Sequence, residues 1–192
     1  ATLAKTIIQS FDIDLEEHLL DEALALYKTF DNNEALAIKK ADTDLYVSEL
    51  YHGPTRAFKD MALQPFGLIL SSIAVQRQEK YLVLAATSGD TGPATLKTFE
   101  NRPNVKVACL YPEGGTSDVQ RLQMVTTDAE NLTVIGVKGN FDDTQNALKA
   151  MLANPEFHTL LAQKGYKLSA ANSVNLGRIL FQTIYHIYSY CE

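Results

Sequence analysis

One short segment joins a forced turn to a lysine: His52-Gly-Pro-Thr-Arg-Ala-Phe-Lys-Asp60. Gly53-Pro54 predicts a turn, and Thr55 is a natural N-cap for a helix that follows it. Lys59 would then lie in the first turn of that helix, where the positive end of the helix disfavours a charged amine by about 0.3–1 kcal/mol. The same field lowers the pKa of the amine, which suits a neutral nucleophile that forms a Schiff base. A solvated surface lysine is the ordinary alternative.

A second loop, Thr87-Ser-Gly-Asp-Thr-Gly92, directly follows the apolar run 81–86. Its two glycines allow a tight turn whose N–H groups could point at a ligand, and its serine and threonines add hydroxyl groups. The positive end of the following helix would help to hold a carboxylate or a phosphate. Asp90 opposes simple anion binding, and it could instead cap the helix or face an ammonium group. A well-capped turn between a strand and a helix explains this loop equally well.

A third polar group opens the last helix of the chain, with Asn172, Ser173 and Asn175 followed one turn later by Arg178. A guanidinium near a helix N-terminus is a good bidentate partner for phosphate. Asparagine and serine are also common helix caps, so capping alone is the ordinary explanation. His52 adjoins the lysine turn and could orient a cofactor or a substrate.

Periodicity predicts the elements that must position these loops. A helical N-terminal segment, with Asp14 as N-cap of its second helix, is followed by a short strand and then by buried strands alternating with helices. Continuous apolar strands of this kind predict an α/β fold with an open, mainly parallel sheet flanked by helices, in which ligands lie at the carboxyl ends of the strands. Pro65 predicts a kink or a restarted helix after the lysine turn. The predicted domains are a helical segment, 1–44, and an α/β domain, 45–192. The predicted strands are 45–50, 81–86, 105–110 and 132–137, and the predicted helices lie within 3–30 and near 66–76, 92–99, 117–124, 141–152 and 174–190.

Composition narrows the classes of function. The chain has 192 residues, 46% of them apolar, and a formal net charge of −6, which argues against nucleic-acid binding. Its two cysteines have no metal-ligand spacing, so no metal site is expected, and a buried free thiol is the ordinary interpretation of Cys109. No apolar run approaches the ~20 residues of a membrane span, and no signal peptide is recognised, so we expect a cytoplasmic protein without membrane contact.

Four segments, in the same order along the chain, resemble signatures of the threonine synthases: 49–60, 87–92, 139–143 and 171–175. The resemblance implies a fold-type II enzyme that uses pyridoxal 5'-phosphate (PLP). It also implies the conversion of O-phospho-L-homoserine and water to L-threonine and phosphate, with PLP held by a Schiff base on Lys59. The cofactor would further contact Ser88, Gly89, Asp90, Thr91 and Gly92, and the substrate would contact His52, Thr87, Ser88, Asn172, Asn175 and Arg178.

The resemblance has departures. Arg56 and Pro65 stand where an apolar and a helix-compatible residue are expected. Family members are also longer, and their glycine-rich loop for the cofactor phosphate has no counterpart after Arg178. The cofactor-phosphate domain is therefore expected to be absent, and this chain alone is expected to bind PLP weakly, to be inactive, and to self-associate through its last helix.

Two other functions stay open. One is another fold-type II lyase or dehydratase that acts on serine or threonine, which the Ser-Gly-Asp-Thr-Gly segment disfavours. The other is a non-catalytic, synthase-like protein that binds a phosphorylated ligand, which the retained Lys59 disfavours.

Overall fold

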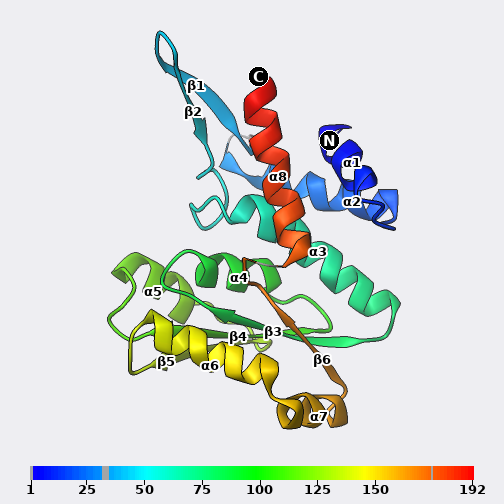
Figure 1. Ribbon diagram of the computed structural model, residues 1–192, viewed down its shortest axis with the longest axis vertical. Helices are drawn as coiled ribbons and strands as arrows, with labels where there is room; N and C mark the ends of the chain where they lie inside the picture. The colour runs from blue at the N-terminus through cyan, green and yellow to red at the C-terminus, as the bar shows by residue number, and fades with distance from the viewer. Residues whose placement is uncertain (1, 32–34, 174) are drawn as a thin grey trace. The chain divides into compact units, whose positions relative to one another are not determined.

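The computed structural model describes residues 2–31, 35–173 and 175–192, and Figure 1 shows its ribbon. The chain forms two compact units. The helical unit comprises Ala1–Ile69 and Ser173–Glu192, and the sheet unit comprises Leu70–Asn172. These boundaries differ from the boundary after residue 44 that the sequence suggested.

The sheet unit is built on four parallel strands in the order β5-β4-β3-β6. In the pairing of β3 with β4, Tyr81 lies opposite Val105, and in the pairing of β3 with β6, Lys80 lies opposite Tyr166. The two central strands carry continuous apolar runs because both of their faces are covered. The predicted α/β fold with a mainly parallel sheet is thereby confirmed. The strands are β3 (Lys80–Ala86), β4 (Val105–Pro112), β5 (Leu132–Val137) and β6 (Tyr166–Ala170).

Helices cover both faces of this sheet (Figure 1). On one side lie α4 (Thr91–Phe99) and α5 (Asp118–Val125), and on the other lie α6 (Phe141–Ala153) and α7 (Pro155–Gln163). Side chains between the layers are fully buried, among them Val83, Val107, Leu96 and Phe99. The sheet is therefore a rigid support for the loops at the ends of its strands.

The helical unit has a core in which residues far apart in the sequence meet. Ile8, Leu20, Ala62 and Phe181 form one buried cluster, drawn from four different helices. A two-stranded antiparallel hairpin belongs to the same unit. Its elements are α1 (Thr2–Ser10), α2 (Glu17–Ala25), the 3-10 helix η1 (Leu26–Thr29), β1 (Ala37–Asp42), β2 (Leu45–Glu49), the first part of α3 (Asp60–Gln76) and α8 (Leu176–Cys191).

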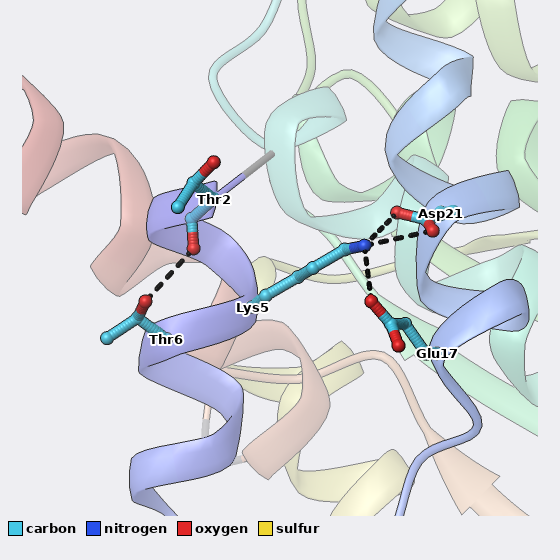
Figure 2. Close-up of polar contacts among 5 residues, drawn as sticks. All are labelled: Thr2, Lys5, Thr6, Glu17 and Asp21. Atoms are coloured by element: carbon cyan, nitrogen blue, oxygen red, sulfur yellow. Dashed lines mark hydrogen bonds and ion pairs between the residues drawn. The ribbon is translucent and has the colours of Figure 1, made fainter.

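A charged contact joins the first two helices. Lys5 extends from α1 to Glu17 and Asp21 on α2, with its Nζ 2.8 Å from an oxygen of each carboxylate (Figure 2). These hydrogen bonds, the one to Asp21 foremost, raise the pKa of Lys5. None of the helices in the described part of the chain is long and apolar enough to span a membrane.

Two predicted helix caps are wrong, and one of the two outcomes predicted at Pro65 is excluded, while the predicted kink stays a prediction. The residue before α2 is Glu16 and makes no side-chain cap, so Asp14 is not the N-cap. Helix α3 begins at Asp60, five residues after Thr55, so Thr55 is not an N-cap either. The helix also continues through Pro65 without restarting. In addition, β1, β6 and α7 were not predicted.

Tyr27 explains how α3 accommodates its proline. Proline has no N–H, so Pro65 cannot donate to the carbonyl of Met61, its partner one turn earlier. The hydroxyl of Tyr27 donates a hydrogen bond to that carbonyl instead. Burial raises the pKa of Tyr27, so the hydroxyl stays protonated and remains a donor. A side chain from η1 thus supplies the bond that the helix lacks.

Because the Tyr27 hydroxyl takes the place of the N–H that Pro65 lacks, substitutions at positions 27 and 65 should be energetically coupled. Tyr27→Phe should lower the free energy of unfolding by about 1–2 kcal/mol, because it leaves a buried carbonyl without this donor. In a Pro65→Ala background the restored N–H supplies the bond, so the same change should cost at most about 0.5 kcal/mol. Chemical denaturation of the unaltered protein, the two single variants and the double variant measures this double-mutant cycle. The exposed Tyr46→Phe is the control. Equal costs in both backgrounds would contradict the explanation.

Candidate functional site

The lysine turn is wrapped around a buried carboxylate. Asp60 has no exposed surface, and its two oxygens accept hydrogen bonds from the backbone N–H of Thr55 at 2.7 Å and from the Thr55 hydroxyl at 2.8 Å. Gly53 lies so close that a Cβ added there would be 2.4 Å from the Cβ of Asp60. Only glycine fits at this position, and the turn from 53 to 60 is therefore fixed on Asp60.

Lys59 immediately precedes α3. Its carbonyl accepts hydrogen bonds from the N–H groups of Ala62 at 3.1 Å and Leu63 at 2.8 Å, so its backbone is the first acceptor of the helix. Its side chain is half-buried, and the ammonium nitrogen lies 4.2 Å from the ring centroid of Phe58. The lysine therefore occupies the positive end of the helix, as expected, although the helix starts one residue after it.

Arg56, which departs from the family pattern, ties the turn to the end of η1. Its backbone is in the left-handed region with a φ of 63°, a conformation that costs a non-glycine residue about 1 kcal/mol. Its guanidinium forms an ion pair with Asp31, whose N–H also donates to the carbonyl of His52 at 3.0 Å. The arginine is exposed, which explains why the position tolerates a charge where an apolar residue was expected.

His52 belongs to a small charged cluster at the end of the hairpin. Its Nε2 lies 3.0 Å from Oε2 of Glu49, and Nζ of Lys39 lies 3.1 Å from the same oxygen. Lys39, above all, holds the pKa of Glu49 below its usual value. The sequence interpretation gave no role to Glu49, although this residue begins the family-like segment 49–60 and lies three residues before His52.

The loop 87–92 is organised by its first hydroxyl. Thr87 is 2% exposed, and its Oγ1 accepts hydrogen bonds from the N–H groups of Gly89 and Gly92, at 3.0 Å each, while donating to the carbonyl of Gly89 at 2.9 Å. The expectation that these two N–H groups point at a ligand is therefore wrong, because Thr87 uses both of them. Ser88, in contrast, is exposed.

Close packing fixes the rest of this loop. Asp90 accepts a hydrogen bond from the side chain of Gln120 at 2.7 Å and makes no side-chain cap to α4. A Cβ added to Gly92 would lie 2.5 Å from the sulfur of Met124 and 3.1 Å from that of Cys109. Burial raises the pKa of the Cys109 thiol to about 12, in agreement with an unreactive cysteine.

The polar residues at the start of α8 have different surroundings, because Asn175 caps the helix whereas Arg178 is buried. Asn175 is the N-cap of α8, and its side chain accepts from the N–H of Arg178 at 3.3 Å, as the capping interpretation expects. Arg178 is 6% exposed, and its Nε donates to Gln182 at 3.3 Å. Burial lowers the pKa of Arg178. Asn172 follows β6 at the end of the sheet unit.

The predicted site residues thus fall in both units. His52, Lys59, Asn175 and Arg178 belong to the helical unit, whereas 87–92 and Asn172 belong to the sheet unit. Within the helical unit, His52 and Lys59 lie on one continuous turn segment. Among the residues that the structure describes, no three His, Cys, Asp or Glu side chains are grouped as metal ligands.

Comparisons with known proteins bear on this arrangement. The chain is 37% identical over 163 residues to threonine synthase of Pseudomonas aeruginosa, covering 85% of this chain and 34% of that protein. It is 34% identical over 193 residues to threonine synthase of Corynebacterium glutamicum, covering 99% of this chain and 39% of that protein. A crystal structure of PLP-bound threonine synthase from Brucella melitensis matches with a TM-score of 0.85 and 33% identity, over 98% of this chain and 40% of that one. A scan against protein-family models finds no match.

The fold and its loops therefore define an α/β protein with the architecture of a PLP-bound threonine synthase. The chain belongs to the threonine synthase family, and it spans about a third of the length of the curated relatives that it matches.

The geometry of Thr87 predicts a large effect of losing one hydroxyl. Thr87→Val keeps the shape of the side chain but leaves the buried N–H groups of Gly89 and Gly92 without their acceptor, which should cost about 2–4 kcal/mol of stability. Thr87→Ser keeps the hydroxyl and should cost less than about 1.5 kcal/mol. Denaturant titration compares the two variants. A valine variant as stable as the serine variant would show that the hydroxyl does not hold the loop.

Proposed function

We propose that this chain is part of a PLP-dependent threonine synthase, which converts O-phospho-L-homoserine and water to L-threonine and phosphate in the cytoplasm. Lys59 is the residue that binds the cofactor through a Schiff base. The observation that carries the proposal is the turn of residues 53–60, which contains Lys59 and is fixed on the buried side chain of Asp60. Bound PLP would withdraw electrons from the reacting carbon atoms of the substrate.

The surroundings of Lys59 suit a nucleophile and proton carrier. Its backbone is held by two hydrogen bonds from α3, whereas its half-buried side chain has four rotatable bonds. The amine belongs to the residue at the positive end of α3, next to the first turn of that helix. In the proposed reaction, the long side chain would let Nζ accept and return protons beside the substrate.

The loop 87–92 supports contacts to the cofactor and to the substrate. Because Thr87 fixes its backbone from inside, Ser88 is presented to solvent at the start of α4, where a helix N-terminus favours an anionic group such as a carboxylate. The proposed role of Thr87 is accordingly to shape the loop. Ser88, Gly89, Asp90, Thr91 and Gly92 remain the proposed cofactor contacts.

The proposed substrate contacts are His52, Ser88, Asn172, Asn175 and Arg178. Arg178 remains the proposed phosphate ligand because its positive charge is buried, and a buried charge is weakly screened. Self-association of this chain is also a proposal, and exposed Leu176 and Ile179 on α8 support it.

Substitution of the lysine tests the proposed function. In the whole protein, Lys59→Ala should lower threonine formation from O-phospho-L-homoserine by about 10³-fold or more, because the covalent attachment and the proton carrier are lost together. Lys40→Ala, which removes a lysine from the exposed strand β1, should leave the rate unchanged. Released threonine and phosphate are measured in the same assay.

Two results would contradict the proposal. Threonine formation at an undiminished rate in Lys59→Ala would exclude the lysine from the reaction. Ammonia release from serine or threonine by the unaltered protein, with no activity on O-phospho-L-homoserine, would instead indicate a dehydratase.

A further inference from the structure

Helix α5 packs one face against the loop 87–92. A Cβ added to Gly89 would lie 2.7 Å from Nε2 and 2.8 Å from Oε1 of Gln120, so the amide group of this glutamine covers the glycine directly. One turn later on the same face of α5, the sulfur of Met124 would lie 2.5 Å from a Cβ added to Gly92. Both glycines of the loop are therefore in close contact with α5, and Gln120 is the polar residue of the two that make this contact.

The amide of Gln120 has a fixed orientation. Its Oε1 accepts hydrogen bonds from the backbone N–H of Ser117 at 3.3 Å and from the Ser117 hydroxyl at 2.9 Å, which completes the capping box of α5. A backbone N–H can only donate, so the oxygen of the amide must face Ser117. The nitrogen of the amide then faces Asp90, and it donates to Oδ1 at 2.7 Å. One side chain thus joins the start of α5 to the loop.

The side chain of Asp90 is directed by this bond and not by its own helix. Asp90 stands at the N-cap position of α4, where an aspartate normally accepts from the N–H groups of the first turn. Its backbone is instead already helical, with φ −61° and ψ −35°, and its side chain makes no cap hydrogen bond. The bond to Gln120 joins residues that are 30 positions apart. A half-buried residue outside the loop therefore sets the direction of a side chain within it.

We infer that Gln120 is a positioning residue for the cofactor loop. Thr87 fixes the backbone of this loop from inside, whereas Gln120 covers Gly89 and holds the carboxylate of Asp90. Gln120 thus acts on the cofactor through the residues that it holds. This inference rests on the proposed function, in which residues 88–92 contact PLP. It deepens that proposal, because it names a residue outside the loop that keeps the loop in its binding shape.

The contact can be tested by reversing the direction of its hydrogen bond. Gln120→Glu keeps the acceptor for Ser117, because glutamate also completes a capping box, but it places a second carboxylate against Asp90. Asp90→Asn keeps the bond, because the asparagine oxygen accepts from Gln120. The double variant restores the bond with the asparagine amide as donor. Only Gln120→Glu alone loses the bond, and any effect of removing the charge of Asp90 cancels in this double-mutant cycle.

Denaturant unfolding of this chain measures the contact without any catalysis. Gln120→Glu should raise the unfolding equilibrium constant about 10-fold when Asp90 is present, and less than about 3-fold in the Asp90→Asn background. Val119→Glu adds the same charge at an exposed neighbouring position of α5 and should change the constant by less than about 3-fold. Equal effects of Gln120→Glu in both backgrounds would overturn the inference. If Gln120→Glu alone does not fold, the double variant must still fold, and a double variant that is also unfolded would overturn it as well.

Binding of PLP to the whole protein measures the positioning role. The dissociation constant of PLP, obtained by spectroscopic titration of the folded, cofactor-free protein, should rise about 10-fold in Gln120→Glu. In the Asp90→Asn background the same change should raise it less than about 3-fold, because the reversed bond still holds the loop. Coupling in the unfolding constant without coupling in the PLP dissociation constant would overturn the positioning role, because the bond would then support only the fold.

A failure of the proposed function gives a different pattern. The unaltered whole protein would then bind no PLP and form no threonine, while the coupling between positions 90 and 120 would persist in the unfolding of this chain. That result would overturn both the proposed function and the role of Gln120 in it. With PLP bound and threonine formed by the unaltered protein, the cycle of dissociation constants decides the inference alone.

Discussion

The buried carboxylate of Asp60 is the constraint on which the lysine turn depends. A carboxyl group without exposed surface must be hydrogen-bonded, and Thr55 supplies two donors across the turn. That requirement brings the chain so close that Gly53 has no room for a side chain. It also sets the start of α3 at Asp60, which places Lys59 at the positive end of the helix. The position of the proposed nucleophile therefore follows from one buried interaction.

The loop 87–92 of the sheet unit is likewise fixed by a buried hydrogen-bonding side chain, here a hydroxyl group. Thr87 is buried and bonded to the backbone of its own loop, while the neighbouring Ser88 is exposed. In both segments a buried side chain uses its hydrogen-bonding groups to fix the backbone, and the adjacent residue is then presented at a helix N-terminus. Such pre-organisation lowers the entropy that a ligand or a reaction step must overcome. The two loops are thus held by hydrogen bonds within the protein itself.

The sequence predicted the elements whose signal is local. The central strands were recognisable because they are continuous apolar runs. Lys59 was singled out by its turn and its family motif, and its role stays a prediction. β6 was missed because Tyr166-Lys-Leu-Ser-Ala170 is a short strand at the edge of the sheet that the structure describes, and β1 because most of its residues are exposed. The start of α3 was misplaced because capping preferences favour Thr55, whereas a bond across the turn decides it. The partnership of Glu49 with Lys39 likewise depends on the register of the hairpin, which no short motif encodes.

The central claim is that Lys59 carries PLP. The most direct test is to treat the whole protein, purified with its cofactor, with borohydride, which reduces a Schiff base to a stable bond, and then to map the modified peptide by mass spectrometry. The claim predicts a pyridoxyl group on Lys59. A pyridoxyl group on a different lysine, or cofactor that is bound but leaves every lysine unmodified after reduction, would contradict it.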